Sequence, residues 1–550
     1  MTVTASSGTH LTVEDVLRFL MPSTLSGEKP LWPPDAYALA ASILKHCGAY
    51  TEIVNVWPPP PSRTPEAWQK RVQAIASQWH RSYARKNQSL PADVERWWKT
   101  ILSAKAFKLD DVRHNTVLLR ALVAIIAAAD ETCEGIGILP IDSPSKLLND
   151  AQVVISRGTL CKKIHRSRVA VLPKLHNSYY GMTLRSLTHN LALWDTAEVS
   201  AFWENSTLEG VDDRINILVI PWPHMTNPNS FRVLKGRLAE KMPKDFGFFS
   251  YDPGEQRVEP DYVLSLVAAA ERIVGKVHAI AFPELSMDSA NYRDIRLAVG
   301  NTLVIAGVGS PAAEPDFGEN FVAIGLGASR GSVMQSKHHR WRVDKRQLSQ
   351  YGINLRTEKK HLWEAIEMVP RECTFFNVNE WLTFCVLICE DLARQDPVAE
   401  LVRSVGPNLV LALLMDGPQI SERWSSRYAT VLADDPRCSV LTLTCAGLVD
   451  LACSQSGRGP RSIGLWKDAE SPEATKVVLE PGAEAIVLAL DHKMEGEWTA
   501  DGRYDGGGTG YVNLTGIYQV MLDGTGGKGT RRVVQTRRKA GARDRGRRKK

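Results

Sequence analysis

The stretch LTFCVLICEDL, residues 382–392, is a continuous apolar run that ends abruptly in Cys389, Glu390 and Asp391. Such a run is typical of a short buried strand, and strand ends are where α/β folds expose reactive groups. The stretch therefore predicts an α/β fold in which Cys389 lies at the exit of a buried strand, beside two acids.

Two earlier apolar runs have the same form. HAIAFPELSMD (residues 278–288) reaches Glu284, and SVMQSKHHRW (residues 332–341) reaches Lys337. A free thiol is only slightly ionised at neutral pH, so a cysteine nucleophile needs a base, which Glu284 can supply. An ammonium group stabilises the thiolate and the oxyanion of a tetrahedral intermediate. Together the three side chains are those needed to break a carbon–nitrogen bond through a thioester.

Each residue also has an ordinary explanation. A cysteine inside an apolar run is usually an inert core residue, which is the expected role of Cys385. A Pro-Glu pair is most often a solvated turn, and a lysine beside two histidines usually lies at the surface. Adjacent histidines point to opposite sides of a strand, so His338 and His339 do not predict a metal site. It is the ordered triplet, on matching strands, that favours a catalytic site without a metal.

These residues resemble the motifs of the nitrilase (carbon–nitrogen hydrolase) superfamily, and the resemblance runs in the family's order from Arg214 to Asp491. It implies an α/β/β/α sandwich in which Glu284, Lys337 and Cys389 are catalytic, with no cofactor. It also implies a small-molecule substrate, an amide rather than a nitrile, and a homodimer or higher oligomer. The expected strands lie in DRINILVIPWP, NTLVIAGVG, ENFVAIGLG, VGPNLVLALLMD, CSVLTLTCAGL and PGAEAIVLALD, and Asn320 sits where the family often has an asparagine.

The chain departs from the family at a second acid. Many members carry another glutamate roughly eight residues beyond the lysine, where this chain has Asp344 or Lys345. We expect Asp344 to take that role. The long charged segment 340–375 predicts an enlarged lid over the pocket. Further candidates for substrate binding or for the second acid are Glu390 and Asp391, and weaker ones are Glu364 and Glu367.

The 550-residue chain is too long for one domain of usual size, so we expect two folded units. Residues 1–205 are predicted to form a mostly helical region of unknown role, because stretches such as PEAWQKRVQAIASQWHRSYARK place Trp68, Val72, Ile75 and Trp79 on one helical face. Residues 211–495 are predicted to form the hydrolase domain, and residues 496–550 a glycine-rich segment and a basic disordered tail.

Composition favours a soluble protein of a reducing compartment. The longest apolar stretch, residues 117–129, is interrupted by Arg120 and is shorter than the ~18 to 20 residues of a membrane span. The opening residues lack the pattern of a secretory signal. Nine cysteines, without paired spacing, favour free thiols over a disulfide framework. We therefore expect a cytoplasmic protein with no membrane contact.

The tail, residues 528–550, carries twelve Lys or Arg and one Asp. Such a segment is predicted to stay disordered alone and to attract nucleic acid without sequence preference. An alternative function is therefore a nucleic-acid-associated module in which the sandwich is an assembly platform. The order of segments is also loosely similar to the nitrilase-like part of bacterial antiviral reverse transcriptase proteins, which suggests a role in defence.

Overall fold

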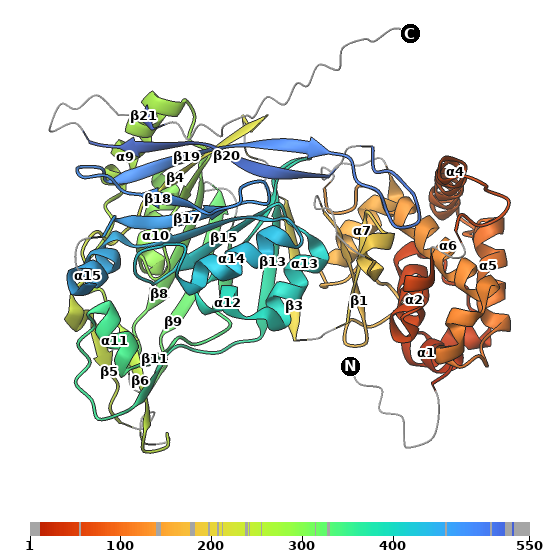
Figure 1. The fold of residues 1–550 in the computed structure, drawn as a ribbon, viewed down its shortest axis with the longest axis horizontal. Coiled ribbons are helices and arrows are strands. Elements are labelled where there is room, and N and C mark those ends of the chain that lie inside the picture. Colours follow the sequence, from red (N-terminus) through yellow and green to blue (C-terminus); the bar gives the residue numbers. More distant parts are fainter. Residues whose placement is uncertain are drawn as a thin grey trace, which may run out of the picture.

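A computed structural model gives the fold of the chain (Figure 1). It describes residues 11–53, 57–138, 145–175, 182–195, 198–205, 208, 210–211, 213–236, 240, 242–254, 256–313, 315–326, 331–456, 459–506, 509–522 and 531–532. Nearly all of the basic tail, and with it the predicted nucleic-acid contact, lies outside the described residues.

The amino-terminal part is helical up to Ile155, as predicted. Trp68, Val72, Ile75 and Trp79 are all buried, so the periodic face of their helix is a core face. The α-helices are α1 (Val13–Leu20), α2 (Pro33–Cys47), α4 (Pro65–Ala84), α5 (Ala92–Ser103), α6 (Thr116–Thr132) and α7 (Lys146–Ile155). Short 3₁₀ turns are η1 (Pro22–Ser26), η2 (Ala49–Glu52) and η3 (Leu109–His114).

Two large sheets form the centre of the remaining part of the molecule. In spatial order, the eight-stranded sheet contains β10 (Ser332–Ser336), β9 (Glu319–Leu326), β8 (Leu303–Ser310), β7 (Ala279–Ala281), β4 (Arg214–Val219), β19 (Ala485–Glu495), β20 (Thr509–Val520) and β21 (Arg531–Arg532). The seven-stranded sheet contains β18 (Thr475–Val478), β17 (Ser462–Lys467), β16 (Ser439–Thr444), β15 (Leu409–Leu414), β14 (Thr383–Ile388), β13 (Arg371–Asn377) and β3 (Val199–Asn205).

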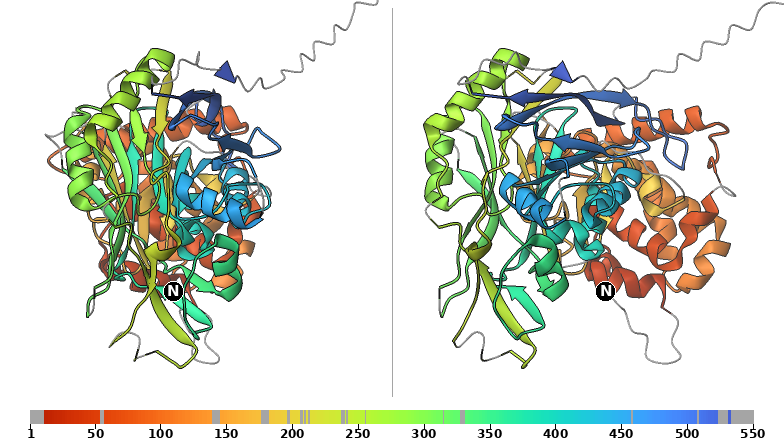
Figure 2. Two further views of the ribbon diagram at one scale, coloured as in Figure 1. Left: turned by 90° about the vertical axis from the view of Figure 1, so that its left-hand side faces the viewer. Right: turned by 60° about the vertical axis from the view of Figure 1, so that its left-hand side comes forward.

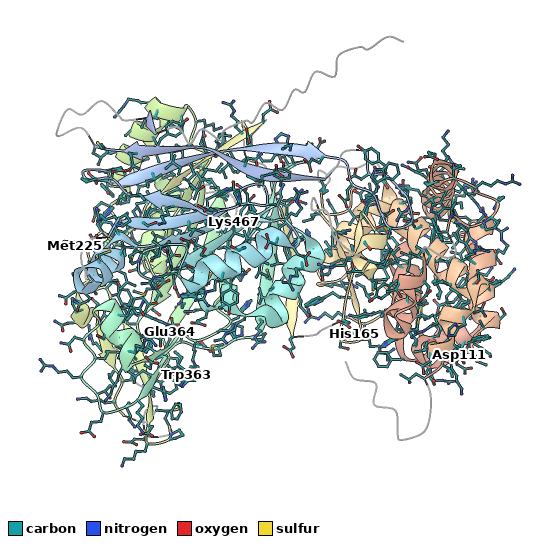
Figure 3. The ribbon with its side chains drawn as sticks, viewed as in Figure 1. Asp111, His165, Met225, Trp363, Glu364 and Lys467 are labelled. Carbon is teal, nitrogen blue, oxygen red and sulfur yellow. The ribbon has the colours of Figure 1, made fainter. Side chains whose placement is uncertain are left out.

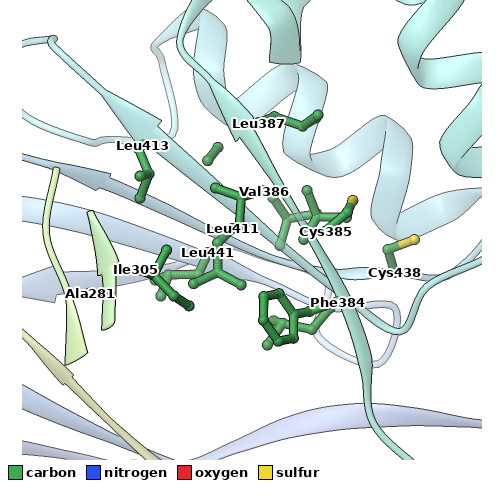
Figure 4. Close-up of a cluster of buried hydrophobic side chains, with 14 of the residues drawn as sticks. Ala281, Ile305, Phe384, Cys385, Val386, Leu387, Leu411, Leu413, Cys438 and Leu441 are labelled. Atoms are coloured by element: carbon green, nitrogen blue, oxygen red, sulfur yellow. The ribbon is translucent and has the colours of Figure 1, made fainter. Parts of the chain in front are cut away.

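Both large sheets are covered on both faces, which gives four layers (Figure 2). Along β4, Ile215 and Ile217 point into the core between the sheets, whereas Leu218 points into a second core shared with α9 (Pro260–Val274) and α10 (Ser289–Ala298). The other sheet is covered by α13 (Glu400–Val405) and α14 (Trp424–Asp434). Figure 4 shows residues of both sheets meeting in the inter-sheet core. Strands buried on both faces read as continuous apolar runs, which explains why the sequence predicts them.

The predicted domain boundaries differ from the edges of the sheets. β3 ends at residue 205, yet it pairs in parallel with β13 along its full length. β20 lies beyond residue 495, yet it pairs with β19 from Ala485 to Glu495. Both strands therefore belong to the sandwich. β3 is an edge strand that buries fewer side chains, so its apolar pattern is weaker than that of a central strand.

Segment 340–375, which the sequence predicts to be an enlarged lid, contains regular structure, and several of its residues line a cavity together with Cys389. It forms β11 (Arg342–Asp344), α11 (Lys345–Tyr351) and β12 (His361–Glu364). The two strands join β6 (Phe246–Tyr251) and β5 (Phe231–Val233) in a four-stranded sheet of order β11-β12-β6-β5. A further pair, β1 (Ala170–Pro173) and β2 (Leu191–Trp194), forms a two-stranded sheet.

The connection between β19 and β20 ties the sandwich to the helices (Figure 1). Its Arg503 is fully buried and donates to Asp130 at 3.0 Å and to Glu131 at 3.1 Å, both on α6. Asp501 of the same connection accepts a hydrogen bond from the Trp68 indole at 2.8 Å. A buried ion that lost these partners would be costly, so the two units are held in one arrangement. Within the described residues, each helix is too short or too polar to cross a bilayer.

Candidate active site

Cys389 occupies a strained turn at the end of β14. Its backbone φ of +46° lies in the left-handed region, which a residue with a side chain rarely adopts. The turn is held because the Cys389 N–H donates to the Leu413 carbonyl at 2.9 Å, and α12 (Glu390–Ala393) begins directly after it. The sharp strand-to-helix turn aims the thiol away from the sheet and into a cavity.

Glu284 lies on a second sharp turn, after β7. The next residue, Leu285, also has a positive φ, of +52°. The turn passes so close to β8 that a Cβ atom on Gly307 would lie 2.4 Å from the Glu284 Cα. Gly307 is therefore required at this position, and it fixes the turn by donating to the Pro283 carbonyl at 3.1 Å.

Lys337, directly after β10, lies between two carboxylates. Its Nζ is 2.7 Å from Oε1 of Glu284 and 2.6 Å from Oε2 of Glu364. The Asn320 amide of β9 bridges the same pair, since Nδ2 lies 2.8 Å from an oxygen of each carboxylate. All four residues are buried, with exposed fractions of 5% or less. This closed network fixes the position of the ammonium group within the interior.

Electrostatics keeps the lysine charged. Burial alone would lower the pKa of Lys337, but the carboxylates of Glu284 and Glu364 outweigh it and hold the pKa well above its ordinary value. Burial raises the pKa of Glu284, an effect that Lys337 opposes and Glu364 reinforces. A carboxylate with a raised pKa is a better proton acceptor near neutral pH than an ordinary one.

Burial favours the protonated form of the Cys389 thiol. Burial, with the negative charge of Glu284, raises its pKa well above the ordinary value, although Lys337 opposes the shift. A base must therefore remove the proton. Oε2 of Glu284 is buried and accepts no hydrogen bond from the residues that the structure describes, so it is available to receive one.

The structure corrects the predicted second acid. Asp344 caps α11, where its Oδ1 accepts a hydrogen bond from the Gln347 N–H at 2.9 Å. Glu364, at the end of β12 (Figure 3), contacts Lys337 instead. The sequence favours Asp344 because it is close to Lys337 along the chain, but this closeness does not identify the acid that contacts Lys337. The signal for Glu364 is the one that identifies the triad, a carboxylate at the end of a strand. Glu367 is exposed.

Asp391 has a positioning contact. Its carboxylate accepts the His338 N–H at 3.0 Å and a hydrogen bond from the His339 ring at 3.0 Å, which joins the turn after Cys389 to the segment after Lys337. The residue is 1% exposed and does not line the cavity. Glu390 does line it, and pairs with Arg394 at 3.0 Å. The described residues contain no group of three or more His, Cys, Asp or Glu side chains placed to hold a metal ion.

Residues of the candidate site line two cavities. The larger, of about 550 Å³, has Cys389 in its wall together with α11, α12 and α14. A small one, of about 20 Å³, is lined by Glu284, Glu364 and Trp341, and is large enough for one water molecule. Cys385 lies in the core between the sheet and its helices, as expected (Figure 4).

Comparison with solved structures finds several matches at low sequence identity. A glutamine-dependent NAD+ synthetase from Acinetobacter baumannii matches with a TM-score of 0.30 and 14% identity, over 50% of this chain and 46% of its own. The chain thus spans about half the length of that protein. Nit3 of Saccharomyces cerevisiae matches with a TM-score of 0.28 and 11% identity, over 51% of this chain and 87% of its own.

XC1258 from Xanthomonas campestris, which has an arsenic adduct in its active site, matches with a TM-score of 0.29 and 12% identity, over 50% of this chain and 90% of its own. No family model and no curated protein matches the sequence. Nit3 is described as a member of the nitrilase superfamily, and XC1258 as a member of the carbon–nitrogen hydrolase superfamily.

Proposed function

We propose that the protein hydrolyses a carbon–nitrogen bond, in an amide rather than a nitrile, through a thioester on Cys389. The observation that carries the proposal is the contact of Lys337 with Glu284 and Glu364 beside a buried thiol that lines a cavity. A base, a fixed cation and a nucleophile in one place are the groups that acyl transfer needs.

In the first half-reaction, Glu284 takes the proton of the Cys389 thiol as the sulfur attacks the amide carbon. A carbon–sulfur bond forms, and the electron pair of the carbonyl moves onto its oxygen. The ammonium group of Lys337 stabilises that oxyanion, together with the backbone N–H of Glu390, which opens α12. The intermediate then collapses, the carbon–nitrogen bond breaks, and protonated Glu284 returns the proton to the leaving amine.

In the second half-reaction, Glu284 is again a carboxylate and removes a proton from water. The water oxygen attacks the thioester carbon, the carbon–sulfur bond breaks, and the thiolate regains a proton from Glu284. The products are a carboxylic acid and ammonia or an amine. The small cavity beside Glu284 and Glu364 has room for that water.

The test is to incubate the protein with a panel of amides and nitriles and to measure the ammonia or amine that is released. Cys389→Ala is expected to fold and to lose all hydrolysis. Cys385→Ala, in the same strand but within the core, is the matched control and is expected to keep it. Equal activity of Cys389→Ala and the native protein would refute the proposal.

Self-association remains a prediction, as does a role in defence. A cyclic dimer is the default symmetric assembly, and light scattering at micromolar concentration would measure it.

A further inference from the structure

The cavity that Cys389 lines has a small excess of positive charge in its wall. Four arginines line it, Arg346 from α11, Arg394 after α12, and Arg423 and Arg427 at α14, against three acidic residues, Glu390, Asp416 and Glu422. Whether this excess can attract an anion depends on which of the arginines lack an acidic partner.

Two of the arginines are neutralised by neighbours. Arg423 lies 2.7 Å from Asp416, which is buried and also accepts a hydrogen bond from the Tyr351 hydroxyl at 2.5 Å. Arg394 lies 3.0 Å from Glu390. All four residues line the cavity, and within each pair the two charges largely offset each other. These two arginines therefore contribute little net charge toward a ligand.

The other two arginines are available. Arg346 and Arg427 are exposed, and neither forms an ion pair with the residues that the structure describes. The remaining acid, Glu422, is exposed and accepts a hydrogen bond from Ser421 at 3.2 Å. Arg346 on α11 and Arg427 on α14 line the same cavity, so both are placed to attract an anion that enters it.

The cavity is large enough to hold a substrate that extends beyond its reacting group. Its volume of about 550 Å³ lies within the range of sites for drug-sized molecules. The rings of Trp424 and Tyr428, 6.2 Å apart, form an apolar part of the wall. Guanidinium groups bind carboxylates through paired hydrogen bonds, which gives direction as well as attraction.

We propose that the substrate is an amide whose acyl part carries a carboxylate at its far end, bound by Arg346 and Arg427 while the amide carbon lies at Cys389. This rests on the proposed function for the identity of the reacting group. The anion preference of the cavity does not depend on hydrolysis, so it can be measured separately.

The test uses three maleimides of matched length, carboxypropyl-, butyl- and aminopropyl-maleimide. The Cys389 thiol gives its proton to a base, its sulfur adds to one carbon of the maleimide double bond, and the adjacent carbon takes up a proton from water. The adduct is therefore the sum of thiol and reagent, and no group leaves. Rates of labelling at Cys389 are measured by peptide mapping, which separates it from the partly exposed Cys453, and are divided by the rates for free cysteine. The expected corrected preference for the carboxylate over the butyl reagent is about tenfold or more, with the amine slowest.

The combined change Arg346→Ala and Arg427→Ala is expected to abolish the preference. Arg356→Ala is the matched control, because Arg356 is an exposed arginine of the same segment that does not line the cavity. Two results would overturn the inference and leave the proposed function intact. In the first, the native protein prefers the carboxylate reagent no more than free cysteine does. In the second, the double variant keeps the preference of the native protein. Hydrolysis of neutral amides by a protein that lacks the anion preference would likewise overturn the inference alone.

A Cys389 that reacts with none of the three reagents would overturn both proposals, because the thiol would then be closed to the cavity. The anion preference together with no hydrolysis of any amide would overturn the proposed function and keep the anion site.

Discussion

The ammonium group of Lys337 lies 2.6 Å from Oε2 of Glu364, an oxygen that also accepts the Trp341 backbone N–H at 3.0 Å. The backbone N–H of Trp341 thus fixes the Glu364 carboxylate, and the carboxylate in turn positions the ammonium group of Lys337. Because Lys337 also contacts Glu284, the proposed base and the proposed oxyanion donor share one buried network. Removal of the Glu364 charge should therefore disturb both groups.

Glu364→Gln tests this coupling. The amide retains the size of the side chain but removes a negative charge from Lys337, and we expect a fall of about 10²-fold in kcat/KM from misplacement of the catalytic groups. Steady-state kinetics with any amide that the native protein hydrolyses measures it. Asp344→Asn is the matched control and should change the rate little, because that side chain caps α11. Equal effects of the two changes would contradict the assignment of Glu364.

The ionisation of Cys389 gives a second prediction. Its pKa is raised above the ordinary value of 9.0, so the thiol should stay protonated as pH rises from 6 to 9. Thiolate absorbance near 240 nm should not differ between the native protein and Cys389→Ser over that range. A difference that appears below pH 8 would mean a thiolate formed in the resting state, with Glu284 not needed as the base.

Gly307→Ala gives a third prediction, because the added methyl group would overlap the backbone of Pro283 and Glu284. We expect a loss of about 10²-fold in kcat/KM from displacement of the base, and destabilisation of ~1–3 kcal/mol from overpacking. Gly331→Ala is the control, since nothing lies within 4 Å of the added atom. Native kinetics for Gly307→Ala would show that the turn carrying Glu284 can move without consequence.

The basic tail gives a fourth prediction. The full chain is expected to retard DNA or RNA of any sequence, with affinity falling steeply between ~50 and ~200 mM salt, and a chain truncated after Gly524 is not. Hydrolysis should be the same in both, because the triad lies in the sandwich. Equal retardation by the two chains would place any nucleic-acid contact outside the tail. Binding with an affinity that does not change with salt concentration would indicate a structured site.

The central strands can be predicted because they are buried on both faces. Continuous apolar runs such as residues 383–388 leave few alternatives, and a polar residue at the end of such a run marks the strand exit, which is the signal for Cys389 and Glu284. Glu364 is a weaker candidate from sequence because β12 is reached through α11 and a connecting loop, so the contact joins residues 27 positions apart. A short separation from Lys337 along the chain therefore does not identify the acid that contacts it.

The contact between the two units could not be predicted. Arg503 meets Asp130 across 373 positions of sequence, and an arginine in a glycine-rich connection is usually solvated. Its burial depends on how the β19–β20 connection reaches α6, which no local pattern encodes. The arginines of the cavity likewise come from separate helices, and only the tertiary fold places Arg346 and Arg427 in the wall of one cavity.

The central claim is a thioester on Cys389, and mass spectrometry of an acid-quenched reaction tests it most directly. During turnover of an amide, the intact mass should rise by that of the acyl group, and peptide mapping should place the adduct on Cys389. Cys389→Ala should show no adduct, and Cys385→Ala should show the native one. Turnover with no acylated protein at any quench time, or an adduct on another residue, would contradict the account.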